Sequence, residues 1–175
     1  MMTNEEQQLG RAKNAVLTFL ENKLIVPKIY LDADWDGRHV DVLAIERDGA
    51  GDVHAVLLFA NHSSGEAENV VDYLTKAIPP LIDRLLQIPA QYKYIASVDV
   101  VPNGGDALPG LPHAIVEQSF SPDGVGKMGF LAIEFLPGQE PEARIVFRAE
   151  RFRAKIAKLA DEYVQQHEAD WEIRA

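Results

Sequence analysis

The sequence predicts an α/β (α+β) protein: a mixed central sheet with an N-terminal helix, a three-strand antiparallel meander and flanking helices. Apolar residues recur at helical spacing near the N-terminus and again after residue 70, whereas residues 28–60 alternate with a period of two between turn sequences. The chain of 175 residues, 47% of them hydrophobic, is long enough to bury a sizeable core. We therefore expect a single domain spanning residues 1–175.

The first predicted element is a helix over residues 4–23. Thr3 and Glu6 match a capping box, in which each side chain accepts a hydrogen bond from a backbone amide of the first turn. An apolar stripe follows at helical spacing: Leu9, Ala12, Val16, Phe19 and Leu20. Pro27 prevents any continuation, because proline cannot donate a backbone hydrogen bond and disfavours helix in the residue before it.

The next element is a hairpin around Asp36-Gly37, a dipeptide typical of a two-residue type I′ turn. Such a turn fixes the register, which gives three cross-strand pairs: Trp35–Arg38, Asp34–His39 and Asp32–Asp41. Alternation then places five apolar side chains on one face, which should lie in the core: Leu31, Ala33, Trp35, Val40 and Val42. The opposite face carries the acidic residues together with Tyr30, Leu43 and Ile45.

A third strand and a long helix follow. Residues 53–60 are almost wholly apolar, as expected for a central strand that is covered on both sides. Ser63 and Glu66 match a second capping box, and helical spacing of apolar residues begins soon after it. Pro79-Pro80 should kink or split this helix, because proline removes backbone donors and clashes with the preceding turn.

The remaining half of the chain predicts further strands and a closing helix. These comprise a fourth strand at 92–101, a Gly/Pro-rich loop at 102–112, a segment at 114–120 that fits either a helix or a strand, a final hairpin from 130–136 and 144–152, and a helix whose apolar positions run from 156 to 164.

The composition excludes several classes of function. The net charge of −10 disfavours a general polyanion partner such as nucleic acid. The lack of cysteine excludes disulfides and thiolate metal sites and fits a reducing cytoplasm, the compartment that we expect. No apolar run reaches the length of a membrane helix, and the acidic start is not a secretory signal.

Two stretches resemble the PD-(D/E)XK nuclease-like superfamily. The opening helix of its small members is similar to LGRAKNAVLTFL, and the hairpin that carries its Asp and its Glu-x-Lys is similar to GRHVDVLAIERDG followed by VHAVLLFA. The predicted order of helix, three-stranded meander, helix and strand is also the core order of that fold. The resemblance covers the first half of the chain and implies that Asp41 stands where the family has its first metal-binding Asp.

The same resemblance implies a degenerate catalytic set. A second turn at 47–52 would place Asp41 across from Leu58 and His39 across from Ala60. In the family, the Glu and the Lys face the Asp from these positions of the third strand. An apolar pair there cannot hold a metal or assist an attacking water, so we assign no catalytic residue.

The hairpin nevertheless suggests a candidate metal site. Four side chains would converge on its acidic face: Asp32, Asp34, His39 and Asp41. Carboxylates and an imidazole could hold Mg²⁺ or Mn²⁺ there. The alternative is a solvated sheet end whose negative charge is balanced by Arg38 or Arg47.

The chain has one basic run, which comprises Arg144, Arg148, Arg151, Arg153, Lys155 and Lys158. Three of these would share a face of a helix that could contact phosphates: Arg151, Lys155 and Lys158. The alternative is a salt-bridged surface, since Asp161 and Glu162 follow closely. His54 and His62 lack ligand spacing and suggest surface histidines with satisfied hydrogen bonds.

The sequence therefore predicts a PD-(D/E)XK-like domain that is a binding or oligomerisation module and not an enzyme. Lys13 and Asn14 support this prediction, since they occupy the helical turn where many members of the family carry a further carboxylate. Such a module needs no cofactor, and its partner would be a protein or a second copy of the chain. Two alternatives remain: a metal-dependent nuclease with its site at Asp32, Asp34 and Asp41, and a nucleic-acid binder that uses the basic run without cutting.

Overall fold

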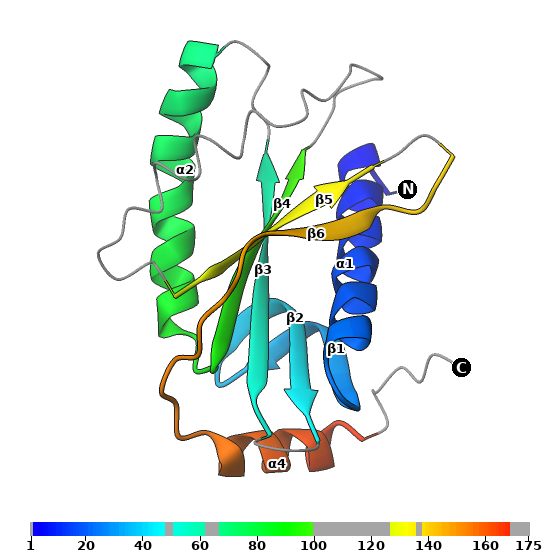
Figure 1. Cartoon of the computed structure of the whole chain (residues 1–175), viewed down its shortest axis with the longest axis vertical. Coiled ribbons are helices and arrows are strands. Elements are labelled where there is room, and N and C mark those ends of the chain that lie inside the picture. The colour runs from blue at the N-terminus through cyan, green and yellow to red at the C-terminus, as the bar shows by residue number, and fades with distance from the viewer. Residues whose placement is uncertain (1, 48–50, 62–66, 100–126, 136–137, 169–175) are drawn as a thin grey trace.

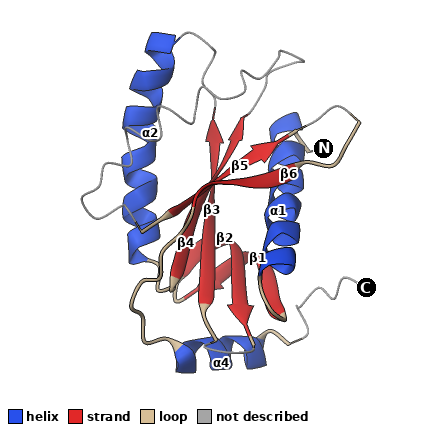
Figure 2. Ribbon diagram, viewed as in Figure 1, coloured by secondary structure: helices blue, strands red, loops and turns tan. Residues whose placement is uncertain are grey.

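The computed structural model describes residues 2–47, 51–61, 67–99, 127–135 and 138–168. Within these ranges, the chain forms helices and strands in the following order: α1 (Asn4–Lys23), β1 (Pro27–Trp35), β2 (Arg38–Glu46), β3 (Val53–Asn61), α2 (Ala67–Gln87), β4 (Tyr92–Asp99), β5 (Gly129–Glu134), β6 (Glu142–Phe147) and α4 (Ala157–Gln166). The fold is α/β with the N-terminal helix first, as the sequence predicts (Figures 1 and 2).

The six strands form one mixed sheet whose spatial order, from β1 to β6, follows the sequence. The β3–β4 and β4–β5 pairs are parallel and the others are antiparallel, which confirms the predicted meander β1–β2–β3. Helices α1 and α2 lie on opposite sides of the sheet, and α4 lies across one end (Figure 1). The sheet therefore separates two apolar cores, one under α2 and α4 and the other under α1.

The predicted bounds and capping box of α1 are confirmed. The Glu6 amide donates to Thr3 Oγ1 at 3.2 Å, and the Thr3 amide donates to Glu6 Oε2 at 2.7 Å. One face of the helix is buried against the sheet through Ala12, Val16 and Leu20. Tertiary burial thus agrees with the local signal, and α1 packs over the core on one side of the sheet.

The register of the first hairpin is as predicted, but its faces are not. Trp35 and Val40 pack in the core beneath α2 and α4, whereas Leu31 and Val42 pack in the core beneath α1. The prediction of one shared core face is therefore wrong. On β1, the change of side coincides with Asp32, whose left-handed φ of 49° interrupts the period-two alternation of that strand.

The other face of that hairpin is also different from the prediction. Tyr30, Leu43 and Ile45, which were expected beside the acidic residues, are buried in the core beneath α2 and α4. Both sides of the sheet are covered by helices at this point, so these three side chains are shielded from solvent.

The predicted register between β2 and β3 is wrong by one residue. Val42 pairs with Val56 and Leu43 with Ala55, which aligns Asp41 with Leu57 instead of Leu58. The turn sequence around residues 47–52 does not fix a loop length, so the register was not determined by local chemistry.

Helix α2 continues through Pro79 and Pro80 without a break. Of the two predicted outcomes, a kink or a split, the split is wrong, because apolar residues on both sides of the prolines are buried against the sheet: Ile78, Leu81, Ile82 and Leu85. This burial outweighs the loss of two backbone donors.

The final hairpin, β5–β6, is confirmed, whereas the helical face predicted for the basic run is wrong. Helix α4 begins at Ala157, so Arg151 and Lys155 precede it and cannot share a helical stripe with Lys158. The predicted capping box at Ser63 and the segments 102–112 and 114–120 lie outside the described residues.

Candidate functional site

Three of the four predicted metal-binding side chains come together on the β1–β2 hairpin. One ligand atom each from Asp32, His39 and Asp41 lies within 4.8 Å of the others. Asp34 pairs with His39 across the strands, but it is exposed and does not join this group. We call Asp32, His39 and Asp41 the acidic cluster.

A lysine from α1 reaches into the acidic cluster. Lys13 Nζ donates to Asp32 Oδ1 at 2.6 Å, and the Lys13 side chain is only 19% exposed. The arginines expected to balance the charge pair elsewhere: Arg38 with Asp36 at 3.7 Å, and Arg47 with Asp161 at 3.2 Å. The compensating cation therefore comes from the helix above the sheet.

Asp41 is the most enclosed carboxylate of the acidic cluster, at 17% exposure. Its Oδ2 accepts from the Leu58 amide at 2.7 Å, and its Oδ1 lies 3.0 Å from His39 Nε2. Both oxygens thus have partners from the protein. The bond to Leu58 also satisfies a backbone donor of β3 beyond the last β2–β3 pair, Val42–Val56.

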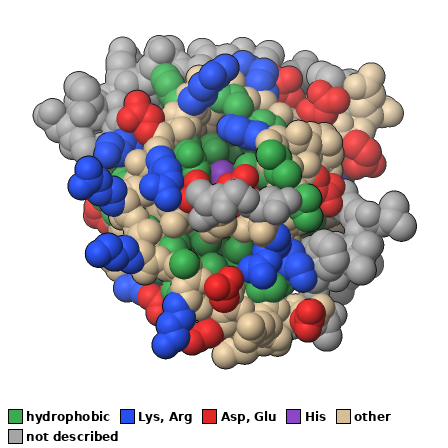
Figure 3. Space-filling view, turned by 60° about the horizontal axis from the view of Figure 1, so that its bottom comes forward, with side chains coloured by type: hydrophobic (Ala, Val, Ile, Leu, Met, Phe, Trp, Pro, Cys, Tyr) green, Lys and Arg blue, Asp and Glu red, His purple; other side chains and the backbone are tan. Residues whose placement is uncertain are grey.

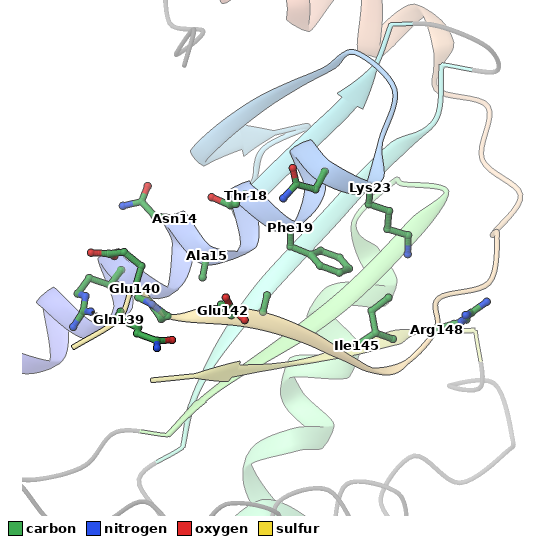
Figure 4. Close-up of a pocket in the computed structure, with 14 residues that line it drawn as sticks. Asn14, Ala15, Thr18, Phe19, Lys23, Gln139, Glu140, Glu142, Ile145 and Arg148 are labelled. Carbon is green, nitrogen blue, oxygen red and sulfur yellow. Dashed lines mark hydrogen bonds between the residues drawn. The ribbon is translucent and has the colours of Figure 1, made fainter. Parts of the chain in front are cut away.

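A cavity lies elsewhere, between α1 and the edge strand β6, and we call it the α1–β6 groove. Its volume is about 1000 Å³. Its lining combines an apolar floor, which includes Phe19 and Ile145, with polar and charged side chains from both elements (Figure 4). Sequence reasoning did not find this groove, because its two walls are more than a hundred residues apart and no motif connects them.

Two cations stand at one end of the α1–β6 groove. Lys23 Nζ lies 5.5 Å from the Phe19 ring centroid and 5.6 Å from that of Tyr94. Arg148 lines the same end (Figure 4). Partial burial, and in second place the nearby charge of Arg148, lower the pKa of Lys23.

His54 is buried beneath this end of the groove, which makes the prediction of a surface histidine wrong. The residue is 3% exposed, its Nε2 lies 3.2 Å from Glu46 Oε2, and its ring stacks on Tyr92 at 4.6 Å. Among the described residues, no hydrogen-bond partner reaches the buried Nδ1. The continuous apolar run of residues 53–60 could have indicated burial, because His54 lies within it and such strands are covered on both faces.

The buried His54 predicts a loss of stability in acid. Burial lowers its pKa, and this effect outweighs the opposing effects of the Glu46 and Asp52 carboxylates. The unfolded chain therefore takes up a proton near the ordinary value of 6.5 while the folded protein does not, and the free energy of unfolding falls as the pH drops below that value.

We expect His54→Gln to flatten this pH dependence between about pH 6.5 and 5. Urea unfolding of both proteins at a series of pH values measures the slope. Equal slopes for the wild type and His54→Gln would contradict the expectation.

Three of the six residues of the basic run form ion pairs. Arg144 Nε lies 2.7 Å from Glu134 Oε1, and Arg151 Nη2 lies 2.9 Å from Asp52 Oδ1. Lys158 lies 3.9 Å from Glu162 on α4. Figure 3, which brings the end carrying α4 forward, shows Lys and Arg side chains spread among acidic and apolar ones. This geometry supports the salt-bridged alternative over a continuous phosphate-binding stripe.

Comparison with known proteins adds no relative. No protein-family model, no curated protein and no solved structure matches the chain. None of the helices in the described ranges has the length and apolarity that crossing a bilayer requires.

Proposed function

We propose that this protein is a non-catalytic PD-(D/E)XK-like binding module, and that its ligand-binding surface is the α1–β6 groove. The observation that carries the proposal is the contact between Lys13 Nζ and Asp32 Oδ1, at 2.6 Å. An ammonium at that distance neutralises the charge of Asp32 and competes with a divalent cation for its Oδ1.

The charges of the acidic cluster support this proposal. Lys13 Nζ lies 2.6 Å from Asp32 Oδ1, and His39 Nε2 lies 3.0 Å from Asp41 Oδ1, so each carboxylate has a side-chain partner. Mg²⁺ and Mn²⁺ favour several oxygen ligands in a regular arrangement. One oxygen of Asp41 already accepts a hydrogen bond from the backbone amide of Leu58. Leu58 packs against the core under α1 and offers no further oxygen from its side chain.

The α1–β6 groove supports the binding part of the proposal. Its volume of about 1000 Å³ is at the upper end of the range for small-molecule sites. An apolar floor with a few charged groups above it is the usual composition of such sites. These features favour a ligand over self-association as the role of this face.

A test of the acidic cluster uses Lys13→Ala. We expect Mn²⁺ to leave the melting temperature of the wild type unchanged and to raise that of the variant, because the substitution frees Asp32 beside His39 and Asp41. A concentration of Mn²⁺ one hundred times its Kd would add about 2.7 kcal/mol to the free energy of unfolding. Differential scanning fluorimetry with Mg²⁺, Mn²⁺ and Ca²⁺ makes the measurement.

Lys158→Ala is the control for this experiment, because it removes the same charge from an exposed position on α4. It should respond to metal as the wild type does. A wild-type protein that Mn²⁺ already stabilises, with the effect lost in Asp41→Ala, would contradict the proposal.

The second candidate function is a divalent-metal-dependent nuclease. The grouping of Asp32, His39 and Asp41 within 4.8 Å favours it, with Asp34 as a further carboxylate on the same hairpin. Cleavage of DNA or RNA that requires Mg²⁺ or Mn²⁺ and disappears in Asp41→Ala would establish this function instead of the first.

A further inference from the structure

The end of the α1–β6 groove holds two cations without a neutralising carboxylate from the described residues. Lys23 and Arg148 both line this end, and neither forms an ion pair with any described side chain. Two other arginines nearby in the sequence do form ion pairs: Arg144 and Arg151 each have a carboxylate partner within 3 Å. Lys23 and Arg148, which both line the groove, differ from these two arginines in charge compensation.

The position of these cations has an electrostatic cost that an anion would remove. Partial burial and the proximity of Arg148 both disfavour the charged form of Lys23 and lower its pKa. An anionic group between the two side chains would replace this repulsion with two charge-assisted hydrogen bonds.

We infer that Lys23 and Arg148 bind the phosphate or carboxylate group of a small organic molecule, whose apolar or aromatic part lies against Phe19 and Ile145. This inference rests on the proposed role of the α1–β6 groove as the binding surface. The aromatic ring of Phe19 and the aliphatic side chain of Ile145 lie in the same groove as the two cations (Figure 4). One ligand can therefore contact all four side chains.

The charges further along the groove favour a compact ligand over a polyanion. Glu142 lies between Ala15 and Ile145, and Glu140 lies with Gln139 at the end away from Lys23 (Figure 4). A chain of phosphates that followed the groove would meet these carboxylates, and the net charge of −10 would repel it before contact. A ligand with one anionic group avoids both.

The test measures binding of phenyl phosphate, benzoate and phenol to the full chain by NMR titration or isothermal calorimetry. We expect phenyl phosphate or benzoate to bind, and Lys23→Gln and Arg148→Gln each to weaken that binding about tenfold, the usual effect of losing one hydrogen bond to a charged group. Arg153→Gln is the control, because it changes the net charge equally outside the groove lining. It should change the affinity less than twofold.

Comparison of phenyl phosphate with benzoate decides which anion the site prefers. An equal loss of affinity in Arg153→Gln, or none in Lys23→Gln and Arg148→Gln, would overturn the inference. Tighter, salt-sensitive binding of a single-stranded oligonucleotide that Arg148→Gln abolishes would overturn it in favour of nucleic acid.

The neutral probe, phenol, separates this inference from the proposed function. Phenol binding that Phe19→Ala removes, without any binding of the two anions, would overturn the anion site and leave the groove as a binding surface. Absence of binding by all three probes at millimolar concentration would count against both. Circular dichroism of each variant verifies that the fold is retained.

Discussion

Trp35→Ala is expected to lower the free energy of unfolding by about 3–5 kcal/mol, the range measured for removing a large aromatic side chain from a core. Trp35 is fully buried, and its ring meets that of Tyr163 edge-on at 5.3 Å between centroids. Its Nε1 donates to the Pro89 carbonyl at 2.7 Å. This one side chain therefore connects the first hairpin to α4 and to the segment between α2 and β4.

Trp35→Phe separates packing from hydrogen bonding in that effect. It retains an aromatic ring but leaves the Pro89 carbonyl without its donor, which should cost about 1–3 kcal/mol on top of a smaller loss of packing. Urea unfolding monitored by circular dichroism gives both values. A cost below about 1 kcal/mol for Trp35→Ala would contradict the described packing, since even one lost methylene carries a comparable cost.

Gly129→Ala is the second substitution with a large expected effect. A Cβ at Gly129 would lie 2.7 Å from Tyr94 Cε1 and 3.0 Å from the Ala149 Cβ, closer than such atoms approach. The Tyr94 ring is 1% exposed and packs in the core under α1, so it has no open space to enter. We expect a loss of about 1–3 kcal/mol in the free energy of unfolding, as overpacking usually costs.

Gly10→Ala is the matched control for Gly129→Ala. Gly10 lies inside α1, and no atom comes within 4 Å of a Cβ placed there. The same substitution should therefore raise the free energy of unfolding by about 0.5–1 kcal/mol, because alanine favours helix. Similar effects of the two substitutions, measured by the same urea unfolding, would show that the strand β5 is not packed against Tyr94 as described.

The sequence was sufficient to predict those elements whose structure depends on residues close together in the chain. The capping box of Thr3 and Glu6 gave the start of α1, and Asp36-Gly37 gave the register of the first hairpin. Only the third strand, with its continuous apolar residues, indicated that helices cover both sides of the sheet. The positive φ at Asp32, which moves Leu31 and Trp35 to opposite sides of the sheet, depends on tertiary packing and could not be read from alternation.

The candidate site follows the same division. Convergence of Asp32, His39 and Asp41 follows from the hairpin register, so the sequence was sufficient to predict it. Lys13 was recognised only as the residue that replaces a carboxylate, because its contact with Asp32 depends on how α1 docks on the sheet. The α1–β6 groove was not predicted at all, since hydrophobic spacing in a helix and in an edge strand carries no information about the space between them.

The α1–β6 groove joins the first helix of the chain to the last strand of the sheet. No shorter part of the topology can make it, because contacts between such distant segments form only after the intervening loops have closed. A ligand bound there would contact both segments, so its binding free energy would stabilise the packing of α1 on β6. A chain that lacks β6 could not form the groove and should not bind the ligand.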